Sequence, residues 1–191
     1  WTMEARKFML ALAVVFCTMA AASSLKKPGR DKTMRIKYLT DINERLYIKW
    51  RNYNDTENRC HSATKKSGNG KHFVYTLRVA FEDWEHMFLY DTNLTTEATP
   101  GHKEDNAAKY KFGPGYPEVV RELIFANQAR NCFILKEELK GNKPGCQLVR
   151  TESTIDNPVP KNCIKAYNQH CSQEKFVLYE DWCKDFPDII R

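Results

Sequence analysis

Residues 161–171, KNCIKAYNQHC, bring together side chains that could do chemistry. Cys163, His170 and Cys171 lie within nine residues. Such a set could ligate a metal, form a reactive thiol with its base, or supply halves of disulfides. Zinc sites usually have cysteines two to four residues apart, and the sequence contains no C-x-x-C. The compartment in which the chain folds therefore decides between these interpretations.

The first 24 residues have the three-part pattern of a secretory signal peptide. A short basic segment with Arg6 and Lys7 precedes an apolar run over residues 8–20, and small residues follow as far as Ser24. The run is shorter than the about 20 apolar residues that a membrane-spanning helix needs. We expect residues 1–24 to be removed and residues 25–191 to form one secreted domain without a membrane segment.

Removal of the signal peptide would leave an even number of cysteines. They are Cys60, Cys132, Cys146, Cys163, Cys171 and Cys183. An even number in a secreted chain favours disulfides, so residues 161–171 are interpreted as a point of cross-linking rather than a metal site. Six cysteines allow 15 pairing schemes, between which the sequence does not choose. We expect neither a metal nor a cofactor.

Signatures of catalysis are scarce. The sequence has no G-x-S-x-G, no H-E-x-x-H and no phosphate-binding loop. The histidines show no metal-ligand spacing, and we interpret them as surface or strand residues: His61, His72, His86, His102 and His170. The net charge of +6 comes from scattered basic residues, so nucleic acid is not an expected partner. The sequence predicts a binding protein rather than an enzyme.

The elements that must position these residues are mostly strands. Alternating or β-rich segments predict strands over residues 45–54, 72–81 and 85–93, two strands within 108–127, and a hairpin over 131–151. A short helix is expected within 36–45, a helix over 160–170 and a last strand over 175–183. Many short strands favour an antiparallel barrel or sandwich.

Several strand and loop residues are candidates for ligand contact or modification. The aromatic residues Trp50, Tyr53, Tyr75, Tyr110 and Phe112 could line a cavity in a small barrel or fill its core. Two N-x-Thr sequons at expected strand ends or loops predict N-glycosylation of Asn54 and Asn93.

The order of the cysteine motifs resembles the tick salivary lipocalins, also called the tick histamine-binding protein family. RNYN precedes Cys60, and RNCFIL, GCQLVR, PVPKNCIKAYNQHC and VLYEDWC follow in order. The resemblance runs from about Asp41 to Cys183. It implies an all-β fold, an eight-stranded antiparallel lipocalin barrel with a C-terminal α-helix packed outside. It also implies a monomer secreted in saliva, with three disulfides: Cys60–Cys183, Cys132–Cys163 and Cys146–Cys171.

The same resemblance implies a ligand site. Family members sequester host mediators such as histamine, serotonin, leukotrienes or fatty acids. An amine binder needs carboxylates for the ammonium and aromatic faces for the ring. The resemblance places Glu122 as the carboxylate and Tyr110 and Phe112 on the aromatic wall. Further ligand-contact candidates are Asp41, Trp50, Tyr53 and Gln147.

Two motifs of the histamine binders are changed in this chain. A D/E-A-W motif corresponds here to Thr33-Met34-Arg35, and a Tyr-Glu-Leu-Trp motif corresponds to residues 146–149, Cys-Gln-Leu-Val. Losing one charged hydrogen bond costs roughly 1.5–3 kcal/mol, which weighs against tight histamine binding.

The family nevertheless favours capture of a small host mediator, an amine first, to evade host defence. Scavenging of a leukotriene or fatty acid, or protein binding through the barrel exterior, are the alternatives. Buried unpaired carboxylates would favour the amine, and an inward guanidinium, for instance from Arg78 or Arg150, would favour the lipid.

Overall fold

The computed structural model describes residues 34–81 and 87–187, so the expected signal peptide lies outside the described residues. The described chain is mostly antiparallel sheet. Its strands are β1 (Leu46–Arg51), β2 (Arg59–Asn69), β3 (His72–Ala80), β4 (Met87–Glu97), β5 (Ala107–Lys111), β6 (Glu118–Ala126), β7 (Cys132–Leu139), β8 (Lys143–Thr151) and β9 (Phe176–Val177). Its helices are α1 (Lys37–Thr40) and α2 (Lys161–His170), with 3-10 turns η1 (Glu152–Thr154) and η2 (Asp181–Lys184).

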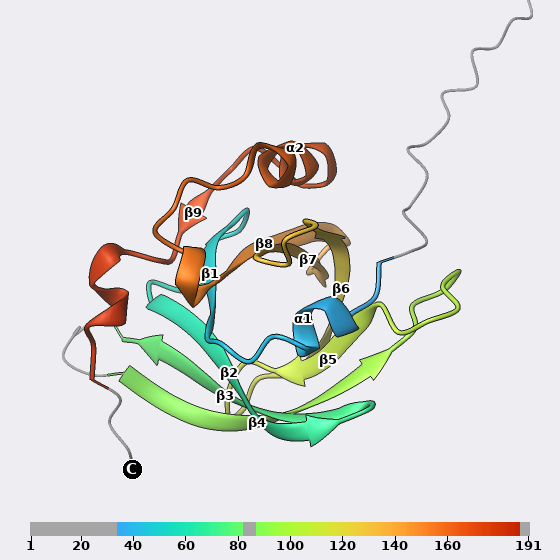
Figure 1. Ribbon diagram of the computed structural model, residues 1–191, viewed down its shortest axis with the longest axis horizontal. Coiled ribbons are helices and arrows are strands. Elements are labelled where there is room, and N and C mark those ends of the chain that lie inside the picture. The colour runs from blue at the N-terminus through green and yellow to red at the C-terminus, as the bar shows by residue number, and fades with distance from the viewer. Residues whose placement is uncertain (1–33, 82–86, 188–191) are drawn as a thin grey trace, which may run out of the picture. The chain divides into compact units, whose positions relative to one another are not determined.

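Strands β1 to β8 close into a barrel because β1 pairs with two partners. Leu46 faces Thr151 of β8 on one side and Ala63 of β2 on the other. The two-residue β9 pairs with the last residues of β1, Trp50 and Arg51. Closure pairs strand edges that would otherwise be open to other chains. The predicted eight-stranded antiparallel barrel with a helix outside is confirmed (Figure 1).

The two ends of the barrel differ. The connections over residues 52–58, 112–117 and 140–142 lie at one end, which we call the mouth. Helix α1 lies at the opposite end, which we call the floor, and its Leu39 packs into the barrel interior together with the preceding Ile36. In Figure 1, α1 lies across the space that the strands enclose. Any ligand in the barrel therefore lies between an apolar floor and a loop-lined mouth.

Alternation along the strands builds the interior. In β3, Phe73, Tyr75, Leu77 and Val79 are buried, whereas the residues between them are half-buried. Side chains two residues apart share one face of a strand, so these four point into the barrel. Strand β3 pairs with β4 over its whole length without interruption, which fixes the same alternation in β4.

Three disulfides fasten the outer segments to the barrel. Cys132–Cys163 and Cys146–Cys171 attach α2 to β7 and β8, and Cys60–Cys183 attaches η2 to β2. These are the pairs that the family resemblance implies. Helix α2 buries one face against the barrel, where Trp50 and Tyr167 belong to a hydrophobic cluster separate from the interior.

The structure differs from the predictions in three places. Strand β2 was not expected, because its sequence RCHSATKKSGN is polar and lacks apolar alternation. The predicted last strand over residues 175–183 is reduced to β9 and η2, because Leu178 and Tyr179 donate their N–H groups to one carbonyl, that of Lys49. Asn93, expected at a strand end or loop, lies within β4.

Candidate ligand-binding cavity

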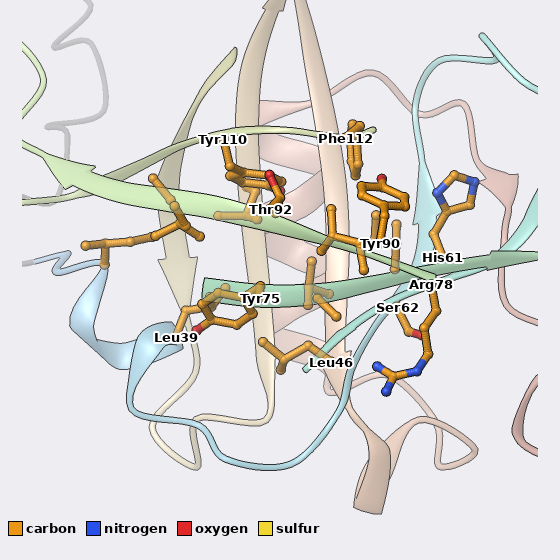
Figure 2. Close-up of a pocket in the computed structure, with 18 residues that line it drawn as sticks. Leu39, Leu46, His61, Ser62, Tyr75, Arg78, Tyr90, Thr92, Tyr110 and Phe112 are labelled. Carbon is orange, nitrogen blue, oxygen red and sulfur yellow. The ribbon is translucent and has the colours of Figure 1, made fainter. Parts of the chain in front are cut away.

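Inward side chains enclose a cavity next to α1. Its apolar and aromatic lining includes Leu39, Leu46, Tyr75, Tyr90, Tyr110 and Phe112 (Figure 2). Its volume, taken as the space open to the centre of a water molecule, is about 60 Å³. That is well below the roughly 300–1,000 Å³ of pockets that bury a drug-sized ligand. No carboxylate is among the described residues that line it.

A wider pocket of about 290 Å³ by the same measure lies at the mouth. It shares His61, Tyr90 and Phe112 with the inner cavity, so these three side chains form the waist between the two spaces. Arg51 and Asp55 also line this pocket and form an ion pair with each other. An elongated ligand could therefore reach from the floor through the waist to a guanidinium.

A buried polar cluster of four side chains fills the other side of the barrel: Tyr53, Arg121, Glu137 and Gln147. Arg121 Nη2 lies 3.0 Å from Glu137 Oε2, and both side chains are almost fully buried. Glu137 Oε1 also accepts hydrogen bonds from Tyr53 and, at 2.7 Å, from Gln147 Nε2. Burial and the negative charge of Glu137 raise the pKa of Tyr53 well above its usual value. The carboxylate of Glu137 thus already accepts from three donors.

Arg121 also contacts the aromatic wall of the cavity. Its guanidinium carbon lies 4.4 Å from the ring centroid of Tyr110 and 4.1 Å from that of Phe112. Both distances are within the range of a cation–π interaction. The barrel therefore already holds a buried cation, supplied by β6.

The imidazole of His61 is neutral. Burial, followed by the positive charge of Arg51, lowers the pKa of His61 to about 3. Its Nε2 is buried without a hydrogen-bond partner in the described part of the chain, and its ring faces Phe112 edge-on. At the floor end of the cavity, the buried hydroxyl of Tyr75 is also without a partner within residues 34–81 and 87–187. A ligand with small polar groups could satisfy these atoms.

The predicted site residues fall into two groups, those inside the barrel and those outside it. Tyr110 and Phe112 line the cavity, and Tyr53 and Gln147 belong to the buried polar cluster inside the barrel. Asp41 lies outside the cavity, at the exposed end of α1, where it accepts a hydrogen bond from Lys37 at 2.7 Å.

Glu122 and Trp50 point away from the cavity. Strand β5 places Ala108 opposite Arg121 and Ala107 opposite Glu122. Ala108 faces the interior, so Arg121 does too and Glu122 faces outward. There Glu122 Oε1 accepts a hydrogen bond from Asn106 at 3.1 Å and lies 3.4 Å from His102 Nε2. Trp50 packs edge-on against Tyr167 of α2, outside the barrel.

Neither arginine considered from the sequence points its guanidinium into the barrel. Arg78 is among the residues that line the inner cavity, but its guanidinium donates to Thr64 Oγ1 at 2.9 Å and points away from the labelled aromatic side chains in Figure 2. Arg150 donates to the backbone carbonyls of Asn131 and Thr154. The guanidinium groups inside the barrel and at its mouth belong instead to Arg121 and Arg51, which sequence reasoning missed.

The missed residues left only weak signals in the sequence. In VVRELIF, residues 119–125, apolar side chains occupy both alternations, so the pattern does not say whether Arg121 or Glu122 faces inward. Glu137 lies in KEEL beside Glu138 and reads as a solvent-exposed charge. A cross-strand pairing of Arg121 with Glu137 becomes visible only when the register of β6 and β7 is known.

Neither a membrane-spanning helix nor a metal site is found in residues 34–81 and 87–187. The helices there are too short or too polar to cross a bilayer. Within the same residues, no three side chains of His, Cys, Asp or Glu form a group that could hold a metal ion.

The comparisons with known proteins agree with the fold. The family described as tick histamine binding protein matches residues 26–185. Japanin from Rhipicephalus appendiculatus, solved bound to cholesterol, is 14% identical with a TM-score of 0.53 over 73% of this chain and 95% of its own. A serotonin complex of AM182 is 12% identical with a TM-score of 0.55 over 76% and 88%.

A third solved structure extends the likeness to other arthropods. Insecticyanin from the tobacco hornworm Manduca sexta is 11% identical with a TM-score of 0.60 over 81% of this chain and 87% of its own. At these identities the likeness shows the fold alone. No curated protein matches the chain.

Proposed function

The chain belongs to the tick histamine-binding protein family, and on this basis we propose that it is a secreted salivary lipocalin that captures a small host mediator in its barrel. The favoured ligand is an apolar mediator with an uncharged or anionic polar end, such as a leukotriene or fatty acid. The observation that carries this choice is the absence of any carboxylate from the described lining of the inner cavity.

The charges around the cavity support an uncharged or anionic ligand. The carboxylate of Glu137 is paired with Arg121 and accepts two further hydrogen bonds. At the mouth, Arg51 offers a guanidinium that an anionic head group could share with Asp55. A buried ammonium in the inner cavity would have no acceptor of opposite charge there, which is costly.

The size of the cavity sets how the ligand must lie. An inner cavity this small buries only a short apolar segment, and about four to six methylene groups would contribute roughly 3–5 kcal/mol. This corresponds to about millimolar affinity, so the inner cavity alone is not enough for capture at low concentration. The rest of the ligand must therefore contact the aromatic side chains of the mouth, among them Phe88 and Tyr116.

Capture of a biogenic amine is the second candidate. The family description favours it, and Glu137 with Tyr110 and Phe112 would provide the carboxylate and the aromatic faces. Serotonin in the AM182 complex is one amine found with a related barrel. In this chain, however, the guanidinium of Arg121 already contacts Glu137, Tyr110 and Phe112, where the ammonium of an amine would have to lie.

Secretion in saliva is part of the proposal. The predicted signal peptide and the three disulfides support it, because disulfides persist in oxidising compartments. Asn54 and Asn93 are both exposed, so both sequons are accessible to glycosylation.

Calorimetric titration of the oxidised protein with arachidonate, leukotriene B4, histamine and serotonin tests the proposal. We expect the two lipids to bind at submicromolar concentration and the two amines to bind at least tenfold more weakly. Tighter binding of an amine would contradict the ligand class. Silence from all four would contradict capture in the cavity and direct attention to the exposed aromatic residues Phe81, Phe88 and Tyr116 as a surface for a protein partner.

A further inference from the structure

The contacts of Arg121 are those that a bound amine would need. A buried ammonium requires a carboxylate that accepts its hydrogen bonds and aromatic faces that attract its charge. Arg121 has both, because its guanidinium lies 3.0 Å from Glu137 Oε2 and stacks on Tyr110 and Phe112 at 4.4 and 4.1 Å. We propose that Arg121 is an internal substitute for an amine ligand, so that this side chain excludes amines from the barrel.

The fold itself does not call for an ion pair at this place. The inward neighbours Leu123 on β6 and Leu135 on β7 are apolar, whereas Gln147 on β8 also turns inward and donates to Glu137. A buried ion pair among such residues is weak evidence for stability, since apolar side chains of similar volume often serve as well. Arg121 Nε and Gln147 Oε1 are buried without a hydrogen-bond partner in the described chain. The arrangement is therefore better explained by specificity than by packing.

The space that Arg121 fills adjoins the inner cavity. Tyr110 and Phe112 contact the guanidinium and also line the cavity. Removal of the side chain beyond Cβ would add its volume to the cavity and leave the carboxylate of Glu137 at the edge of the enlarged space. A small aromatic amine could then place its ammonium on Glu137 and its ring among the cavity residues. This inference rests on the proposed function, because it accounts for the preference for ligands without positive charge.

The test compares the native protein with Arg121→Ala in calorimetric titrations with histamine and serotonin. Arg35→Ala is the matched control, because it removes a half-exposed guanidinium that is paired with Glu104 and lines neither the inner cavity nor the mouth pocket. We expect Arg121→Ala to bind at least one amine about 10- to 100-fold more tightly than the native protein, the effect of one charged hydrogen bond. Arg35→Ala should bind amines as the native protein does.

The double variant Arg121→Ala/Glu137→Gln tests whether the gain comes from the proposed site. We expect the gained amine affinity to disappear in it, because the carboxylate is gone. A gain of less than threefold in Arg121→Ala, or a gain that persists in the double variant, would overturn the proposal.

Failure to fold would still leave a readout. Arg121→Ala leaves Glu137 without its cation, and a ligand that binds only the folded state stabilises that state. Millimolar histamine should raise the thermal midpoint of Arg121→Ala, or restore its folding as followed by circular dichroism, whereas imidazole at equal concentration should not. Absence of this rescue would refute the inference.

Titration with arachidonate separates this inference from the proposed function. If the native protein does not bind arachidonate, leukotriene B4 or either amine, capture in the barrel fails. If the native protein binds the lipids and Arg121→Ala gains no amine affinity, only the inference about Arg121 fails.

Discussion

Replacement of Glu137 by Gln should destabilise the protein far more than the same replacement of Glu122. Glu137→Gln leaves the guanidinium of Arg121 buried without an anion, and both side chains are almost fully removed from solvent. Breaking a buried ion pair from one side costs about 3–5 kcal/mol. Glu122 lies on the outer face with Asn106 and His102 as neighbours, and a glutamine there keeps an acceptor oxygen. We expect Glu122→Gln to cost about 1 kcal/mol or less.

Urea unfolding at pH 7 with the disulfides oxidised measures both effects. For a slope of about 1–3 kcal/mol/M, the midpoint of Glu137→Gln should fall by roughly 1–5 M, with the slope itself unchanged. Equal midpoints for the two variants would mean that Arg121 and Glu137 do not form a buried ion pair that stabilises the fold. A larger loss for Glu122→Gln would mean that the inward residue of β6 is Glu122 and not Arg121. That result would also remove the basis for the proposed ligand class.

Three further predictions concern other parts of the structure. Burial lowers the pKa of His61 to about 3, so between pH 6.5 and 3 only the unfolded state binds a proton at this imidazole. The native protein should therefore lose up to about 1.4 kcal/mol of stability for each pH unit in this window, and His61→Phe should lose less. Identical pH profiles of the urea midpoints of the two proteins would contradict this. Replacement of Cys60 and Cys183 by Ala removes a disulfide between residues 123 positions apart and should lower the unfolding free energy by roughly 4–5 kcal/mol. Urea unfolding measures this loss, and Cys146→Ala/Cys171→Ala, which removes a disulfide that closes a shorter loop, should lose less stability. Trp50→Phe should leave the dissociation constant for arachidonate within twofold of the native value, since Trp50 packs against α2 outside the barrel; a tenfold loss in a calorimetric titration would place it at the site instead.

The barrel could be predicted from the sequence largely because its strands carry their own signals. Residues 72–80 alternate apolar and polar side chains, and residues 131–151 form a hairpin around a Gly-containing turn. Strand β2 carries no such signal, since only Cys60 and Ser62 of its side chains are buried. Its pairing with β3 and β1 comes from tertiary contacts, which override weak local preferences.

The aromatic wall was found from the sequence and the charged centre was not. The family resemblance placed Tyr110 and Phe112 on this wall, and both line the inner cavity. Size alone does not predict this position, because Trp50 is also a large aromatic side chain in a strand and packs against α2 outside the barrel. The charged centre depends on the face of β6 that turns inward, and a shift of one residue exchanges Arg121 for Glu122. The sign of the charge that the barrel presents to a ligand therefore rests on a register that β5 and β7 impose.

This division explains how a chain can keep a family's fold while its ligand changes. The cysteine motifs that carry the family resemblance fasten α2 and η2 to the outside of the barrel, and none of these cysteines lines the inner cavity or the mouth pocket. The inward set of Tyr53, Arg121, Glu137 and Gln147 forms none of those cross-links, and its Arg121 contacts the cavity wall. Substitutions at these inward positions can reverse the charge preference of the cavity without loosening the disulfide-bonded shell. We therefore expect the inward residues of β6 to β8 to decide the class of ligand, and not the cysteine pattern by which the family is identified.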